Sequence, residues 1–147
     1  MDASIQHAAK FLNAISNAIG RLENFAYSLV LRFNAVKRRS ASAHMSNGGH
    51  VCIACSFPVD DAGHRWLIWG IDVEWTTNEW CVQATAEEED DSNDPSTTRY
   101  WESVQFRAAT LDEFVGCLDS ALDEIEKSLT TPQIAEIFEK YRNTKDT

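Results

Sequence analysis

The sequence predicts an α+β fold in which a four-stranded antiparallel meander follows one long helix and precedes two further helices. Three observations predict it. Apolar residues repeat in heptads through the first 38 positions, a two-residue alternation dominates residues 50–107, and a 3.6-residue apolar stripe begins at 111. Because the helical and strand patterns come in separate runs, the order α-β-β-β-β-α-α indicates neighbouring antiparallel strands within a single domain, residues 1–147.

The first expected element is a helix over residues 3–38. Two heptad positions are apolar throughout, the first with Ile5, Leu12, Ile19, Ala26 and Phe33, the second with Ala8, Ile15, Leu22, Leu29 and Val36. Such a helix would be about 54 Å long, longer than a domain of this size is wide. It therefore either kinks near Gly20 or projects at one end. Additional apolar residues favour packing on the sheet, and the alternative is a homodimer through this helix.

Residues 40–49 are small and polar and end in a glycine pair, which is typical of a linker. The sheet is expected over residues 50–107. Its first strand, residues 51–57, alternates apolar residues on one face, and Pro58 ends its pairing.

Residues 64–85 predict a tryptophan-rich hairpin that turns at Thr76-Thr77-Asn78, since Asn tolerates the left-handed backbone of such turns. In its first arm, one face carries Leu67, Trp69, Ile71, Val73 and Trp75. Trp66 and Ile68 point the opposite way, so this part of the sheet is expected to be covered on both faces. Asp72 and Glu74 then return the second face to solvent or to a partner.

The segment after the hairpin holds six acids in eight residues, 87–94. Mutual repulsion predicts an exposed loop, which either docks a basic partner or only keeps the protein in solution. A strand is expected over residues 99–107, with Trp101 and Tyr100 beside the acidic segment.

Two C-terminal helices are expected over residues 111–142. Thr110 and Glu113 form a capping box before the first, and Pro132 occupies the first position of the second. Both carry an apolar stripe with acidic residues mainly on the solvent side.

The charge is divided unevenly along the chain. Its formal net value is −10. Residues 1–50 contain six Lys/Arg and two acids, whereas residues 51–147 contain seven Lys/Arg and twenty-one acids. The acidic part argues against nucleic acid as a ligand, because each phosphate contact needs a Lys or Arg. It fits a basic protein partner, and the simplest alternative is that the charge serves solubility alone.

Targeting signals are not apparent in the sequence. No apolar run approaches the roughly 18–20 residues of a membrane span, and the N-terminus lacks the pattern of a secretory signal. A cytoplasmic protein without membrane association is therefore expected. Four cysteines are too few for a disulfide scaffold in 147 residues, which favours free thiols.

The pair Cys52 and Cys55 has the C-x-x-C spacing of redox and zinc sites. Within a strand, however, residues three apart point to opposite faces, and a redox pair needs a helix N-terminus. Zinc would need His44, His50 or Cys81 as further ligands, without a second paired motif. Structural cysteines are the favoured interpretation, and we expect no metal and no cofactor.

Catalytic patterns are also lacking. The four histidines are scattered, and no nucleophile elbow, metalloprotease helix or phosphate loop occurs. The sequence therefore predicts a non-enzymatic binding protein. We expect its partner-binding residues to be the acids of the hairpin and the following segment with the neighbouring aromatics, namely Asp72, Glu74, Glu87, Glu88, Glu89, Asp90, Asp91, Asp94, Trp80, Tyr100 and Trp101.

In architecture and composition the chain resembles the immunity proteins of bacterial polymorphic-toxin systems, which are small, acidic α+β proteins with tryptophan-bearing meanders and a terminal amphipathic helix. No signature motif carries the resemblance, and no residue role is transferred by it. It implies a cytoplasmic protein that neutralises a cognate toxin domain, often a basic nuclease.

Three other functions fit the same sequence. The first is an acidic mimic of nucleic acid that inhibits a host defence enzyme, and the second is a secretion chaperone that uses the long helix. The third is a small enzyme or ligand-binding domain whose pocket is lined by Trp66, Ile68 and Trp101 against the sheet.

Overall fold

The computed structural model describes residues 3–33, 40–45, 50–60, 64–90 and 96–145, and for 40–45, 96–100 and 141–145 it describes the backbone. Three helices and five strands lie within these ranges: α1 (Ala3–Phe33), β1 (Ser40–Met45), β2 (Val51–Pro58), β3 (Arg65–Thr76), β4 (Glu79–Asp90), β5 (Ser96–Ala108), α2 (Leu111–Ser128) and α3 (Pro132–Lys145). No helix among them is both long and apolar enough to cross a lipid bilayer.

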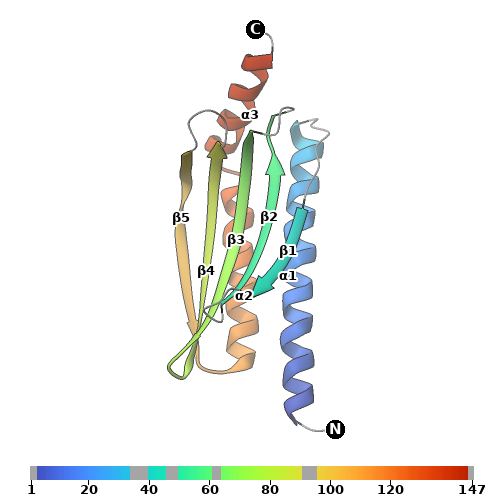
Figure 1. The fold of residues 1–147 in the computed structure, drawn as a ribbon, viewed down its shortest axis with the longest axis vertical. Coiled ribbons are helices and arrows are strands. Elements are labelled where there is room, and N and C mark those ends of the chain that lie inside the picture. Colours follow the sequence, from blue (N-terminus) through green and yellow to red (C-terminus); the bar gives the residue numbers. More distant parts are fainter. Residues whose placement is uncertain (1–2, 34–39, 46–49, 61–63, 91–95, 146–147) are drawn as a thin grey trace.

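The strands form one sheet in the order β1-β2-β3-β4-β5, with every neighbouring pair antiparallel. This confirms the predicted α+β fold and meander (Figure 1). The prediction of a linker over 40–49 is wrong for 40–45, which form β1 along the edge of β2, from Ser40 opposite Ser56 to Met45 opposite Val51. Backbone groups make these ladder bonds, so small polar residues suffice at an edge. Residues 46–49 lie outside the described ranges.

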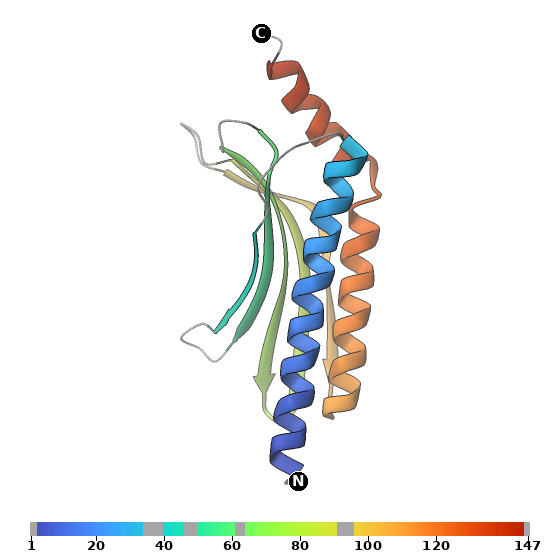
Figure 2. The same ribbon diagram turned by 90° about the vertical axis from the view of Figure 1, so that its right-hand side faces the viewer.

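The molecule has two layers, with α1 and α2 side by side on one face of the sheet (Figures 1 and 2). Two ion pairs show how the helices are aligned. Lys10 contacts Asp112, and Arg21 contacts Asp123, so each pair joins residues separated by 102 positions. A constant separation means that the helices run parallel, because an antiparallel pair would show a constant sum instead.

The α1 helix is unbroken from Ala3 to Phe33, and Gly20 lies within it. The expected kink near Gly20 is therefore wrong, and the alternative of a projecting end describes the structure better. Ile5 and Leu12 near the N-terminus are 58% and 64% exposed, whereas Leu22 and Leu29 further along are buried. Residues 34–38, the rest of the predicted helix, lie outside the described part of the chain.

The core lies between the two helices and the sheet face that they cover. Along β3, Leu67, Trp69, Ile71 and Val73 are all at most 1% exposed, as the two-residue alternation predicts. The other apolar side chains of this core come mainly from β2, β4 and the three helices, and include Ile53, Phe57, Val82, Leu22, Leu29, Phe114, Leu118, Leu122, Ile125, Ile134 and Phe138.

The β3–β4 hairpin has the tight turn expected from the sequence. Trp75 pairs with Trp80 and Thr76 with Glu79, which leaves a two-residue turn of Thr77 and Asn78. Asn78 has a φ of 68°, the left-handed conformation that such turns require. The turn is thus one residue shorter than the predicted Thr76–Asn78 segment.

The prediction of a loop over residues 87–96 is wrong for 87–90 and for Ser96, which belong to strands, and residues 91–95 lie outside the described part of the chain. Glu87, Glu88, Glu89 and Asp90 continue β4, which pairs with β3 up to Arg65 opposite Asp90 and with β5 up to Ser96. Pairing on both sides supplies the backbone hydrogen bonds that hold four consecutive acids in a strand, and alternation places successive side chains on opposite faces. Asp91 and Asp94 lie outside the described residues.

Candidate partner-binding surface

The sheet face opposite the helices has no helical cover in Figure 2, and we call it the open face. The expectation that the sheet is covered on both sides around Trp66 and Ile68 is therefore wrong. These two side chains are half-buried among their strand neighbours. From the register, the open face includes Cys52, Ala54, Ser56, Trp66, Ile68, Asp72, Glu74, Glu79, Cys81, Gln83, Thr85, Glu87, Glu89, Gln105 and Arg107. Arg99 also takes a position on this face, opposite Glu87, and its side chain lies outside the described part of the structure.

Carboxylates dominate the charge of this open face. Five acids lie on it, and among the described side chains its only lysine or arginine is Arg107, which contacts Glu79. His50 at its edge places Nε2 3.5 Å from Oε1 of Glu74. Asp72 lies opposite Cys52 and Gln83, and Glu89 lies opposite Trp66 and Thr97, so the acids of this face outnumber its basic residues and the surface potential favours cationic partners.

The structure separates the predicted partner-binding residues. Asp72, Glu74, Glu87 and Glu89 lie on the open face, as expected of a docking surface. Glu88 and Asp90 alternate to the covered side at the end of β4, where Asp90 Oδ2 lies 3.4 Å from Nε of Arg65. Asp91 and Asp94, together with the side chain of Tyr100, lie outside what the structure describes.

The two tryptophans proposed as anchors belong to the covered face instead. Trp80 and Trp101 are partly buried and pack against the core. The rings of Trp80, Phe11 and Phe114 form a three-way cluster, in which Trp80 is 5.6 Å from Phe11 and 4.8 Å from Phe114 between centroids. Trp101 is opposite Ala86 on β4, on the sheet face away from Trp66, so these two tryptophans cannot line one pocket.

A hollow of about 340 Å³ lies on the open face, at the end of the sheet near the β3–β4 turn. We call it the acidic hollow, and its lining residues are His50, Cys52, Asp72, Glu74, Cys81, Gln83 and Gln105. Gln105 donates from Nε2 to Sγ of Cys81 at 2.8 Å, which orients its side chain across β4. The hollow presents two carboxylates and two amides from three adjacent strands.

The Cys52 thiol of the hollow is protonated at neutral pH. Burial, with the negative charge of Asp72 and a hydrogen bond to it, raises the pKa of Cys52 to about 11. Cys55 lies on the covered face and is fully buried, which confirms that the C-x-x-C pair points to opposite faces. A thiol with so high a pKa is a poor nucleophile and a poor metal ligand. No group of three or more potential ligands is placed to hold a metal among the described side chains.

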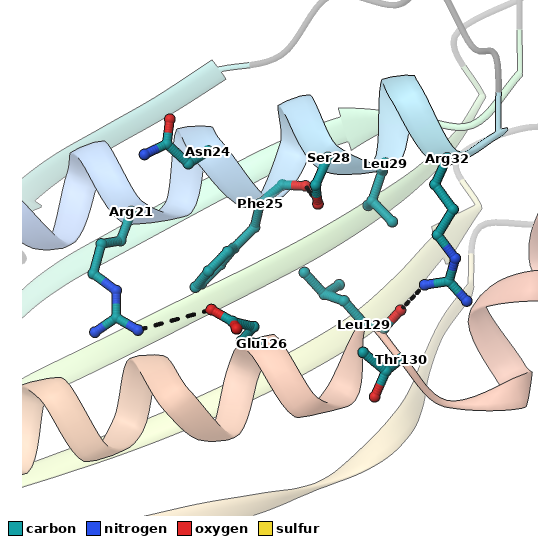
Figure 3. A pocket seen from close by; sticks show the side chains of 9 residues that line it. All are labelled: Arg21, Asn24, Phe25, Ser28, Leu29, Arg32, Glu126, Leu129 and Thr130. Carbon is teal, nitrogen blue, oxygen red and sulfur yellow. Dashed lines mark hydrogen bonds and ion pairs between the residues drawn. The ribbon is translucent and has the colours of Figure 1, made fainter.

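A second hollow, of about 530 Å³, lies in the seam between α1 and α2 (Figure 3). Arg21 reaches three carboxylates of α2: Asp119, Asp123 and Glu126, at 3.8, 2.8 and 3.9 Å. Arg32 donates from Nη1 to the Leu129 carbonyl at 2.6 Å. Both guanidinium groups are thus engaged within the chain, and we assign this groove a structural role.

This seam was missed in the sequence, where the acids of α2 were interpreted as a solvated face. A signal was present, because Lys10, Arg21 and Arg32 are spaced by eleven residues and therefore share one side of a helix. Lys10, Arg21 and Arg32 are consequently engaged within the molecule, where their contacts hold α1 against α2 and the residue that follows it.

Comparisons of the chain with protein-family models, with curated proteins and with solved structures find no match. The resemblance to toxin immunity proteins therefore stays an expectation.

Proposed function

We propose that this chain is a non-enzymatic protein-binding module that neutralises a basic toxin domain by docking it on the open face of the sheet. The observation that carries the proposal is an uncovered sheet face whose register places five acids on it against two arginines, Arg99 and Arg107. Charge complementarity of this kind accelerates association and selects basic partners.

The distribution of ion pairs supports the choice of face. On the helical side, Lys10 and Arg21 are matched with acids of α2, so that side offers alternating charges of both signs. On the open face, Glu79 contacts Arg107 and Glu87 lies opposite Arg99, whereas Asp72 and Glu89 are each opposite uncharged residues. A basic partner that approaches the open face therefore meets more acidic than basic residues.

At the end of the open face away from the β3–β4 turn, two side chains add an apolar contact area. Trp66 and Ile68 are half-buried and lie opposite Glu89 and Glu87 on β4. Tryptophan at the centre of a patch with a polar rim is a frequent hot spot of protein interfaces. This pair replaces Trp80 and Trp101 as the proposed aromatic and apolar anchors. Toxin neutralisation of this kind would take place in the cytoplasm, before the toxin is exported.

An acidic mimic of nucleic acid is the second candidate. The observation in its favour is that Glu87 and Glu89 belong to an ordered strand instead of a loop. Acids two positions apart in a strand are separated by about 6.4–6.8 Å, so they form a regular row of negative charge. A mimic would compete with duplex DNA for its target, whereas a partner bound elsewhere on the toxin would leave DNA binding intact.

Co-expression tests the proposal. A toxic basic protein encoded next to this chain is expressed alone, with the wild-type chain, and with two matched triple variants. The first variant, E74Q/E87Q/E89Q, removes three charges from the open face. The second, E23Q/E136Q/E139Q, removes three charges from exposed positions of the helices. We expect growth to be rescued by the wild type and the helical variant, and lost with the open-face variant.

The same proteins are then compared in vitro. Binding of the wild type to the toxin domain should weaken as salt concentration rises, because exposed charges are screened. Equal protection by both variants, or no binding by the wild type, would contradict the proposal. Competition by duplex DNA decides between the two candidates, since only a mimic is displaced by it.

A further inference from the structure

We infer that the acidic hollow of the open face receives the guanidinium group of a single arginine side chain from the basic partner. This inference rests on the proposed function and specifies the chemistry of its contact. The volume of about 340 Å³ is within the usual range of small-molecule pockets and is ample for one side chain.

The arrangement of acceptors fits a planar, multidentate cation. Asp72 and Glu74 are two positions apart on β3, so their carboxylates project from the same face about 6.4–6.8 Å apart along the strand. Gln83 lies opposite Asp72 on β4, and Gln105 follows on β5. Amide oxygens from these two residues extend the row of acceptors across the sheet. Guanidinium has five N–H donors in a fixed fork, whereas an ammonium group is a compact point charge.

The residues that line the hollow supply little positive charge of their own. None of its seven lining residues is a lysine or arginine, and its one basic group, His50, lies 3.5 Å from Glu74 and not beside Asp72. The raised pKa of Cys52 reflects burial first and then the negative charge of Asp72. Both facts indicate negative potential at Asp72 that nothing in the hollow neutralises.

A divalent metal is a poorer occupant than a guanidinium group. Hard metal ions require a compact cage of several ligands, and the described side chains offer no group of three placed to hold one. Guanidinium instead tolerates acceptors spread over a plane, which is what three neighbouring strands provide.

The experiment titrates the isotope-labelled protein with a capped glycyl-arginyl-glycine peptide and follows backbone amide shifts by NMR. The probe is compared with the lysyl peptide and with the citrulline peptide, which has almost the same shape but no charge. We expect saturable shifts at Asp72, Glu74, Gln83 and Gln105 with arginine, weaker ones with lysine and none with citrulline. Shifts of equal size with citrulline, or shifts away from the hollow, would overturn the inference.

Matched variants locate the site. D72N/E74Q removes two charges from the hollow, and E87Q/E89Q removes two from the same face outside it. We expect the dissociation constant for the arginine peptide to rise about tenfold in the first variant and to change less than about twofold in the second. If D72N/E74Q does not fold, E74Q alone serves, because Glu74 is at the surface. Equal effects of both pairs would contradict the inference.

A second readout separates this inference from the proposed function. If the toxin binds the open face but D72N/E74Q and E87Q/E89Q weaken it equally, the arginine site is wrong and the docking function stands. If the arginine peptide titrates the hollow as expected while no basic toxin binds, the site stands and the function is wrong.

Discussion

The two faces of the sheet are built from the same strands and have opposite chemistry. On β3, Leu67, Trp69 and Ile71 are buried under the helices, while the intervening positions include Asp72 and Glu74 on the open face. Apolar area removed from water stabilises the fold, whereas exposed carboxylates contribute little to stability. The covered face therefore supplies the stability of the fold, and the open face can carry charged residues at little cost to that stability.

The open face is itself divided at Gly70. Above it lie Trp66 and Ile68, and beyond it lie Asp72 and Glu74. A Cβ atom at Gly70 would lie 3.5 Å from the Ile53 carbonyl oxygen and 3.8 Å from Thr85 Oγ1, which are ordinary contact distances, so the backbone of this position is closely surrounded by its neighbours. Protein interfaces commonly combine an apolar centre with a polar rim, and this face provides both.

The largest expected difference between the faces is in stability. Phe114→Ala should lower the free energy of unfolding by about 3–5 kcal/mol, because this ring is fully buried and stacks with Phe11 at 5.5 Å. Ile68→Ala on the open face is the control and should cost about 1 kcal/mol or less, since the side chain is half-buried. Urea denaturation measures both. Similar losses for the two variants would mean that the open face also belongs to the core.

The helical cover depends on the start of α2, where the predicted capping box is present. Thr110 Oγ1 accepts from the Glu113 N–H at 3.2 Å, and Glu113 Oε2 accepts from the Ala109 N–H at 3.0 Å. Thr110→Ala should therefore destabilise the protein by about 1 kcal/mol, while Thr110→Ser should retain most of the stability. Thermal melts compare the two. An unchanged alanine variant would show that packing alone fixes this end of the helix.

The ion pairs in the seam between α1 and α2 should contribute less to the free energy of unfolding than the helix cap does. Arg21→Met retains the apolar stem and removes the charge that three α2 carboxylates share, so we expect a loss of about 0.5–1 kcal/mol. The loss should shrink in 1 M NaCl, because these carboxylates are more than 60% exposed and salt screens them. Lys140→Met on the exposed surface of α3 is the control. A loss that does not vary with salt would assign the effect to packing.

The smallest expected effect is on the chemical reactivity of two thiols, Cys52 on the open face and Cys55 on the covered face. Because the pKa of Cys52 is raised to about 11, its alkylation in the native protein should be slow at pH 8 and accelerate as pH approaches 11. Asp72→Asn should lower that midpoint only in part, since burial is the larger cause. Cys55, fully buried on the covered face, should react only on unfolding. Mass spectrometry after pulse alkylation distinguishes the two thiols.

The same raised pKa predicts how stability varies with pH. The folded protein holds the Cys52 proton more tightly than the unfolded chain, whose thiol has an ordinary pKa of about 9. The contribution of Cys52 is therefore fully present below about pH 9 and is lost as the pH rises towards about 11. Cys52→Ser should flatten this part of the stability profile. A profile that keeps its slope in the variant would assign the loss to other groups.

The candidate site could be predicted from the sequence only in part. Asp72 and Glu74 were assigned to the exposed face of β3 because alternation is a local property of the strand. The covered face of Trp80 follows from the same alternation, because Trp80 shares its side of β4 with Val82 and Ala84 and pairs with Trp75. The face of Trp101 instead depends on the register of β5 against β4. That register includes irregular pairing between Ala84 and Glu87, which a sequence pattern does not reveal.

The sequence by itself determined those features whose causes lie within a few residues: the order of helices and strands, the buried side of β3, the Asn78 turn and the capping box of α2. Only the tertiary structure decided that 40–45 and Glu87–Asp90 are strands, because their backbone hydrogen bonds come from partner strands. It also decided that α1 runs parallel to α2, and that the helices leave one sheet face open. Those outcomes depend on which surfaces meet, and contacts between distant segments are not encoded in any local pattern.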